Sequence, residues 1–344
     1  MEKNTLLLIG NHLHTPKRNK NVWHFLAEML ASHGWVVMTT SDKMNQVLRL
    51  LDMVWTIIRH RKQYAVAQVD VFSGKAFIWS EVCTWLLKKL RKPVILTLHG
   101  GKLPEFARQH PKRVKRVLQA ADAVVSPSPY HQIRLKEYRD DIRLIPNPVN
   151  IDFSRFVLRK QAQPKLVWVR AFHEVYNPSL AIQVLQLLVS EFPESELLMI
   201  GPDKEDGSLA KVREQMTAFN LSNWVNIVGG IQHTEVPEYL NKGDIFINTT
   251  NYDTAPRSVL EAMANGLCVV STNVGGMPWI ISHGQDGLLV PPNDARAMAE
   301  AVRRIVKEPA LAVKLSANAR KNAELYDWSS ILPLWEEIFT SFLE

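Results

Sequence analysis

Residues 251–294 are NYDTAPRSVLEAMANGLCVVSTNVGGMPWIISHGQDGLLVPPND. Apolar residues recur at helical spacing from 257 to 265, and two short apolar runs follow at 268–273 and 287–292. Pro256 stands where the first turn of this helix would begin, a position that tolerates a residue without a backbone N–H group. The segment therefore predicts one helix and then two strands of a parallel α/β sheet.

The same alternation extends over the rest of the chain. Further strands are expected in the second half at 165–170, 196–201, 225–230 and 245–250, and in the first half at 5–10, 35–40, 67–72, 94–99 and 123–128. Amphipathic helices are expected between them, near 20–33, 44–62, 77–91, 103–120, 178–191, 208–219, 234–241, 295–306 and 309–323. This pattern favours an α/β fold of two Rossmann-like, doubly wound parallel sheets in series.

A polar stretch with three prolines, residues 146–165, separates the two series of strands. We therefore expect an N-terminal Rossmann-like domain over 1–155 and a C-terminal one over 156–327. Residues 328–344 predict a terminal amphipathic helix that packs back toward the N-terminal domain through Trp328, Leu332, Trp335 and Phe339. Because ligands bind at the carboxyl ends of parallel strands, we expect a binding cleft between the two strand sets.

The composition is that of an ordinary soluble protein of 344 residues. No apolar run approaches the roughly 20 residues that a membrane-spanning helix needs, and the apolar start at 5–10 is too short for a secretory signal. The two cysteines, Cys83 and Cys268, lie in apolar surroundings, so that neither a disulfide framework nor a zinc site is indicated. These features favour a reducing cytoplasm.

The net charge of +7 is distributed unevenly along the chain. Residues 1–155 contain 25 Lys and Arg against 12 Asp and Glu, whereas the remainder contains 16 against 22. The excess is densest at 59–62, 86–93 and 108–116, close to Trp55, Trp79 and Trp85. Basic clusters beside apolar helical faces indicate an anionic membrane surface as a partner; the alternative is a solvated basic face. No nucleic-acid motif accompanies the charge, so we expect no nucleic-acid partner.

Two carboxylates in the segment 251–294 suit the recognition of a sugar. Asp253 lies in the loop after a strand, and Glu261 lies on the following helix. Carboxylates accept two hydrogen bonds from vicinal hydroxyls in a defined geometry. The start of the helix offers backbone N–H groups and a positive dipole end to a phosphate, and Gly275 and Gly276 allow the backbone to approach a ligand closely. The segment therefore predicts a site for a phosphorylated sugar compound.

This segment resembles the C-terminal signature of the GT-B glycosyltransferases of family 4, E-x-F-G-x-x-x-x-E-A-M-A-x-G-x-P-V-V. The matching elements are EAMANG, VGG and DGLLVPPND, in order and at the right spacing. Matches to other motifs of the family extend over nearly the whole chain, at 122–128, 145–156, 198–201, 228–229, 244–246 and 287–290. The resemblance implies two Rossmann-like domains that face a cleft.

Carried over by this resemblance, Glu261 would hold the ribose of the donor and Asp253 would reach the transferred sugar. Arg170 would bind the donor phosphates, His99 would approach the transferred sugar, and Gly10 falls in a loop that normally carries a glycine pair. The donor site would also include Gly201, Gly229, Thr254, Ala255, Pro256, Arg257 and Ser258. The resemblance implies neither a metal ligand nor a cofactor, and no Asp-x-Asp pair of the metal-dependent transferases occurs in a suitable loop.

Three positions depart from the family pattern. Asp253 replaces the first glutamate and is shorter by one methylene. Asn177-Pro178 stands where the family usually has Lys-Gly, so that one phosphate-binding cation is missing. The loop after Gly10 is GNHLHTPKRNKNV in place of a Gly-Gly turn, and Lys17, Arg18 or Lys20 could supply charge there.

The resemblance implies a retaining, metal-independent transfer of a hexose or N-acetylhexosamine from a UDP- or GDP-linked donor. The acceptor would be a saccharide or a lipid-linked saccharide in cell-surface glycan synthesis, at the inner face of the cell membrane. Two alternatives stay open: a UDP-sugar 2-epimerase, and a catalytically silent subunit that binds sugar nucleotide, which the missing lysine would explain. Neither G-x-G-x-x-G nor G-x-x-x-x-G-K-[ST] occurs, so hydride transfer and ATP hydrolysis are not supported.

Overall fold

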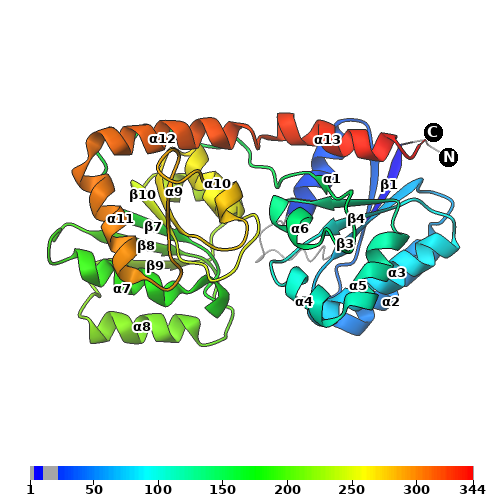
Figure 1. Ribbon diagram of the computed structural model, residues 1–344, viewed down its shortest axis with the longest axis horizontal. Coiled ribbons are helices and arrows are strands. Elements are labelled where there is room, and N and C mark those ends of the chain that lie inside the picture. The colour runs from blue at the N-terminus through cyan, green and yellow to red at the C-terminus, as the bar shows by residue number, and fades with distance from the viewer. Residues whose placement is uncertain (1–3, 11–21, 344) are drawn as a thin grey trace. The chain divides into compact units, whose positions relative to one another are not determined.

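The computed structural model describes residues 4–10 and 22–343 (Figure 1). The chain divides into two compact units, the first made of Met1–Asn147 with Ser329–Glu344 and the second of Pro148–Trp328. The division lies before residue 155, where we had placed the boundary, because the intervening residues contact the second unit. Val149 pairs with Asp327 in an isolated bridge, and the Arg155 N–H group donates to Asn265 Oδ1 at 2.9 Å.

The first unit contains a six-stranded parallel sheet in the order β2-β1-β3-β4-β5-β6. Its strands are β1 (Thr5–Ile9), β2 (Val36–Thr40), β3 (Val66–Val71), β4 (Val94–Leu98), β5 (Ala123–Ser126) and β6 (Arg143–Leu144). Its helices are α1 (Val22–Ser32), α2 (Gln46–Arg59), the 3-10 helix η1 (Gly74–Ala76), α3 (Phe77–Lys89), α4 (Leu103–Gln109), α5 (Pro111–Ala120), α6 (Pro129–Arg134) and α13 (Trp328–Thr340). The strand order reverses between β1 and β3.

One face of this sheet is covered by α2, α3, α4 and α5, which share a buried cluster with alternate residues of β1, β3 and β4. The rings of α1 and α13 contact one another: Trp23 lies 5.9 Å from Trp335, and Trp335 stacks on Phe339 at 5.6 Å. All four apolar residues predicted on one face of the terminal helix are buried. The helix α13 is therefore part of the first unit although the second unit precedes it in the sequence.

The second unit contains a six-stranded parallel sheet in the order β12-β11-β10-β7-β8-β9. Its strands are β7 (Lys165–Val169), β8 (Glu196–Ile200), β9 (Val225–Gly229), β10 (Ile245–Asn248), β11 (Cys268–Thr272) and β12 (Leu288–Val290). Its helices are η2 (Glu174–Tyr176), α7 (Pro178–Leu188), α8 (Ser208–Ala218), η3 (His233–Glu235), α9 (Val236–Leu240), α10 (Arg257–Ala264), η4 (Met277–Trp279), α11 (Ala295–Lys307) and α12 (Pro309–Glu324). Here the order reverses between β7 and β10.

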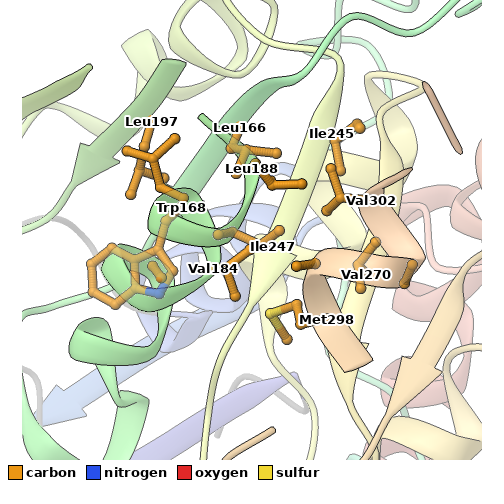
Figure 2. Close-up of a cluster of buried hydrophobic side chains, with 14 of the residues drawn as sticks. Leu166, Trp168, Val184, Leu188, Leu197, Ile245, Ile247, Val270, Met298 and Val302 are labelled. Atoms are coloured by element: carbon orange, nitrogen blue, oxygen red, sulfur yellow. The ribbon is translucent and has the colours of Figure 1, made fainter. Parts of the chain in front are cut away.

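Alternate side chains of each strand in the second unit point to opposite faces of the sheet. Leu166 and Trp168 of β7 join a cluster with residues of α7, α8 and α11 (Figure 2). Val167 of β7 and Phe246 of β10 join the other cluster, which includes residues of α9, α10 and α12. The unit is thus a three-layer α/β sandwich, and its loops at the carboxyl ends of the strands are left to bind ligands.

Every predicted strand is present, and the predicted parallel α/β class is confirmed. The helix expected over 103–120 is wrong as a single element, because it is divided at His110 into α4 and α5. Pro111 lacks an N–H group and its ring disfavours the helical conformation of the residue before it, and His110 has φ −131° and ψ 53°. The sequence analysis missed β6 and α6, which are too short to show a periodicity.

Both cysteines are buried and free. Burial raises the pKa of each thiol to about 12, so that neither is a reactive thiolate at neutral pH. Within the described ranges, no helix is long and apolar enough to cross a bilayer.

Candidate functional site

An ion pair lies at the point where the strand order of the second sheet reverses. Arg170 directly follows β7, and Asp253 lies in the loop after the neighbouring strand β10. The Arg170 Nη2 atom is 2.5 Å from Asp253 Oδ2, and the two side chains are only 14% and 17% exposed. The carboxyl ends of strands at such a reversal are where open parallel sheets bind ligands. The two residues predicted to act on the donor phosphate and the sugar are therefore brought together.

Each partner of this pair is held by further contacts. Asp253 Oδ1 accepts hydrogen bonds from the N–H groups of Thr254 and Ala255, at 2.7 and 3.3 Å. The Arg170 guanidinium lies 4.8 Å from the centre of the Tyr176 ring. Its Nε atom is buried and has no hydrogen-bond partner among the described residues. Arg170 thus holds Asp253 through Nη2, while its buried Nε group makes no hydrogen bond to the described part of the chain.

Two glycines let the backbone pack closely around the pair. A Cβ atom at Gly201, which follows β8, would lie 1.7 Å from the Arg170 carbonyl oxygen. A Cβ atom at Gly275, where φ is +54°, would lie 1.8 Å from the Asp253 carbonyl oxygen. Both positions therefore require glycine. The neighbouring Gly276 donates its N–H group to that same carbonyl at 2.9 Å, and Gly229 accepts a hydrogen bond from the Gly201 N–H group at 2.8 Å.

Glu261 is placed by α10, one helical turn after Arg257. His233 Nε2 lies 2.7 Å from Glu261 Oε1, and Arg257 Nη2 lies 3.3 Å from the same oxygen. Arg257 Nη2 is also 3.0 Å from His233 Nε2. A guanidinium only donates, so this last contact is not a hydrogen bond while Nε2 donates its proton to the carboxylate. Glu261 therefore has two polar partners on one oxygen.

The charge state of Glu261 follows from these neighbours. Burial of the carboxyl would raise its pKa, but the hydrogen bond from His233 and the charges of Arg257 and Arg170 outweigh burial, so that the pKa lies below its ordinary value. Glu261 is thus a carboxylate at neutral pH and accepts hydrogen bonds. That is the state required to hold the hydroxyls of a ribose.

The first turn of α10 is the expected phosphate site. Pro256 is the residue before the helix, which begins at Arg257 as the sequence predicted, and no side chain among the described residues caps its first N–H groups. Ser258 and Thr254 are buried beside it, and the Ser258 hydroxyl has no hydrogen-bond partner within the described part of the chain. An uncapped helix start with a buried hydroxyl suits an anion.

Asn177 is not a phosphate-binding cation in this structure. It has φ 46° and ψ 58° directly before α7, and its Nδ2 donates to Asn293 Oδ1 at 2.9 Å. Asparagine tolerates this left-handed conformation better than most residues do. The Asn177 side chain therefore links the start of α7 to Asn293. The arginines near Glu261 are Arg170 and Arg257.

The predicted residues of the first unit lie at the carboxyl ends of β1 and β4, the two strands that flank β3. His99 follows β4, and its Nε2 is 3.2 Å from Asp70 Oδ1 in β3. The ring stacks on Phe72 at 5.0 Å and meets Trp23 edge-on at 5.1 Å. Gly10 follows β1, and a Cβ atom there would lie 2.1 Å from Asp70 Oδ2. Gly10 thus makes room for Asp70, which in turn orients His99. The loop that contains Lys17, Arg18 and Lys20 lies outside the described residues.

Sequence analysis did not select two site residues, His233 and Asp70. Asp70 had a detectable signal, since AQVDVF places Gln68 and a carboxylate inside an otherwise apolar strand. In the structure Gln68 Nε2 donates to Asp70 Oδ1 at 2.8 Å, and the other oxygen, Asp70 Oδ2, is buried without a partner among the described residues. His233 had only a weak signal, its position shortly after the strand end and the glycines 229–230.

The fold is that of the GT-B glycosyltransferases. Sucrose-phosphate synthase from Thermosynechococcus elongatus matches 98% of this chain, and 98% of its own, with a TM-score of 0.80 and 21% sequence identity. The Anabaena protein HepE, solved in complex with UDP and glucose, matches 98% of this chain and 99% of its own with a TM-score of 0.79 and 17% identity. The predicted two-domain architecture is confirmed.

The family follows from sequence models. The model of glycosyl transferases group 1 matches residues 150–322, half of the chain, and that of glycosyltransferase family 4 matches residues 30–153. This chain belongs to the group 1, family 4 glycosyltransferases, as the resemblance implied. Among its relatives is the D-inositol 3-phosphate glycosyltransferase of Thermobispora bispora, 22% identical over 84% of this chain and 74% of that protein. The alignments to the first five curated relatives cover only 17% to 38% of their length.

Proposed function

We propose that this chain is a retaining, metal-independent glycosyltransferase that moves a hexose-type sugar from a UDP- or GDP-linked donor to an acceptor. The observation that carries the proposal is the Arg170–Asp253 pair at the strand reversal, with Arg257 and Glu261 beside it. In the reaction, the bond between the sugar C1 and the donor phosphate oxygen breaks. A bond from C1 to the acceptor oxygen forms on the same face, and the acceptor proton passes to the leaving phosphate.

Each residue of the second unit has a proposed part in that reaction. Arg170 and Arg257, with the first N–H groups of α10, neutralise the charge that grows on the leaving diphosphate. Glu261 accepts the ribose hydroxyls, and Asp253 accepts a hydroxyl of the transferred sugar. Arg257 supplies a second cation, which supports an active enzyme in spite of Asn177. In the first unit, His99 contacts the transferred sugar through the ring nitrogen that Asp70 does not engage.

Substitutions of Asp253 test whether this residue acts on the transferred sugar or only in donor binding. We expect Asp253→Asn to lose activity while donor binding stays normal, because an amide cannot accept hydrogen bonds at both of its terminal atoms. Asp253→Glu restores the family residue, and we expect reduced but detectable turnover with a wider choice of sugar. Initial rates and calorimetric donor affinities would be compared with those of Asp203→Asn, an exposed aspartate of the same unit. Wild-type turnover in Asp253→Asn would remove Asp253 from the reaction.

The two arginines also predict independence from metal ions. Since guanidinium groups and helix N–H groups neutralise the diphosphate in this proposal, turnover should be unchanged after treatment with EDTA. Sugar transfer would be measured before and after chelation and again after addition of Mg²⁺ or Mn²⁺. Loss of turnover that either metal restores would show that the diphosphate needs a cation from solution.

The acceptor is proposed to be a saccharide, or a saccharide linked to lipid, at the cytoplasmic face of the cell membrane. The charge excess in residues 1–155 supports this location. Product analysis with and without acceptor separates the alternatives. A 2-epimerase would form an altered sugar nucleotide without any acceptor, and a silent subunit would bind nucleotide without turnover.

A further inference from the structure

The helix α2 presents an apolar face to solvent. Its outward side chains are between 41% and 67% exposed, and they are Val47, Leu48, Leu51, Trp55 and Ile58. Residues spaced three, four, seven and eleven apart lie on one face of a helix. Met44, just before the helix, is also 67% exposed. These six residues, which we call the α2 face, form a continuous apolar stripe on the surface of the first unit.

The inward side of α2 carries the charge that a surface helix normally exposes. Arg49 is only 5% exposed. Its Nε donates to the Lys43 carbonyl oxygen at 2.9 Å, and its guanidinium lies 4.9 Å from the Trp79 ring of α3. Asp52 accepts a hydrogen bond from Thr40 at 3.2 Å. Met53 and Ile57 already fill the core beneath the helix. The residues of the α2 face are therefore not core residues that a rotation of the helix has turned toward solvent.

The neighbouring helix extends this apolar surface. The helices α2 and α3 pack side by side, as Figure 1 also shows. Two side chains of α3 are exposed, Ile78 at 46% and Trp85 at 62%. Soluble monomers rarely expose a contiguous apolar surface made of several large side chains, and such surfaces mark sites that another molecule covers.

The charges around the α2 face identify what could cover it. Residues 43–92 contain ten Lys and Arg against three Asp and Glu. Of these three acids, Asp70 is buried and Glu81 pairs with Arg113 and Arg116, whereas Asp52 accepts a hydrogen bond from Thr40 and keeps its charge. The exposed Asp42, just before this range, pairs with Lys43. The exposed basic residues nearby are Lys43, Arg59, Arg61, Lys62, Lys75, Lys89 and Arg91.

We propose that the α2 face, with Ile78 and Trp85, inserts into the interface of an anionic lipid bilayer. An apolar stripe beside basic residues is the arrangement of helices that lie in the headgroup region, and tryptophan favours that depth. Each nearby basic residue adds to the attraction to an anionic surface. A protein partner would need matching acidic groups around an apolar groove, whereas an anionic bilayer offers both over any area. The inference rests on the proposed membrane-linked acceptor and names the surface that would reach it.

The structure also corrects which basic residues are available to lipid. Lys88 donates to both oxygens of Asp122, at 2.7 and 2.9 Å. Lys92 donates to the Tyr64 carbonyl oxygen at 2.6 Å and lies over its ring. These two residues of the basic cluster 86–93 stabilise the fold, so that replacing them would test stability as well as binding. Arg59, Lys62 and Lys89 are exposed and make no ion pair within the described ranges.

The test is co-sedimentation of the full chain with vesicles of phosphatidylcholine, with or without phosphatidylglycerol. We expect Leu51→Gln/Trp55→Gln to raise the lipid concentration for half-maximal binding by about tenfold or more, because two of the largest inserted side chains are lost. The matched control is Leu325→Gln/Phe153→Gln in the second unit, which also removes an exposed leucine and an exposed aromatic residue, 69% and 59% exposed. We expect this control to bind as the wild type does. Arg59→Gln/Lys62→Gln/Lys89→Gln should bind less to the anionic vesicles only.

A second measurement is the quenching of tryptophan fluorescence by lipid. Brominated lipid should quench part of the tryptophan fluorescence of the wild type, and the quenching should be smaller in Leu51→Gln/Trp55→Gln. Equal binding of that variant and its control would overturn the proposal. So would a wild-type dimer in lipid-free buffer that the same variant converts to a monomer, because the α2 face would then contact a second copy.

The outcomes distinguish this proposal from the proposed function. Vesicle binding together with a failure to bind any sugar nucleotide would contradict the enzymatic function and leave the membrane surface standing. Transfer to a soluble acceptor without vesicle binding would contradict only the membrane surface.

Discussion

Glu261→Ala should lower turnover by roughly a hundredfold or more and weaken the binding of nucleoside diphosphate by about tenfold, since buried groups lose their partner. The ligand's ribose hydroxyls would lose their acceptor. The protein would lose the carboxylate that faces His233 and Arg257. The nitrogen donors of these two residues would then lie close together without a counter-charge. Both losses act on the bound state, so affinity and rate should fall together.

Two variants make this result specific. Glu261→Gln keeps the shape and one acceptor oxygen, and it should recover part of the affinity but little of the rate. Glu238→Ala removes an exposed glutamate from α9 in the same unit and should change neither quantity. Calorimetry with UDP and GDP and initial rates with the matching sugar nucleotides provide the two readouts. Unchanged nucleotide affinity in Glu261→Ala would place Glu261 outside the donor site.

Arg170→Ala should have the largest effect on rate, a loss of about a thousandfold, because charge on the leaving phosphate grows toward the transition state. The ground-state affinity for the sugar nucleotide should change less. Arg170→Lys keeps a charge but loses the Nε donor and the planar contact with Tyr176, and should recover only a small part of the rate.

The matched control for Arg170 is Arg304→Ala, which removes an arginine paired with Glu308 on the surface of the second unit. The rate constant for turnover and the Michaelis constant would be compared across the three variants. A rise in the Michaelis constant at unchanged turnover would mean that Arg170 contributes only uniform binding. A larger loss for neutral sugar analogues than for nucleotides would assign Arg170 to the sugar.

The sequence predicts the layers of this protein well because its strands are buried on both faces. Runs such as TLLLI in β1 and CVVST in β11 are mostly apolar and buried throughout, as expected for a parallel sheet between two layers of helices. Short edge elements such as β6 are exposed and have no such run. The break at His110 depends on one proline, and a helical periodicity that continues on both sides of it conceals the break.

The candidate site is predictable only where a residue's neighbours in sequence determine its role. Asp253 and Glu261 share a loop and a helix, so that their spacing is visible in the sequence. His233 lies 28 positions before Glu261 and reaches it only through the packing of η3 on α10. The sequence indicated Trp55 and the basic clusters near it as a membrane surface, but it did not select the rest of the α2 face, because an amphipathic pattern does not reveal which side of the helix the sheet will cover.

The place of α13 in the first unit has a consequence for biosynthesis. The first 147 residues supply the whole sheet of that unit, but the rings of Trp335 and Phe339, which contact Trp23 and Trp35, are translated after the entire second unit. Until α13 emerges from the ribosome, those tryptophans have no cover from it, and such transient apolar surfaces attract chaperones and promote aggregation. The N-terminal unit therefore begins to fold first and is completed last.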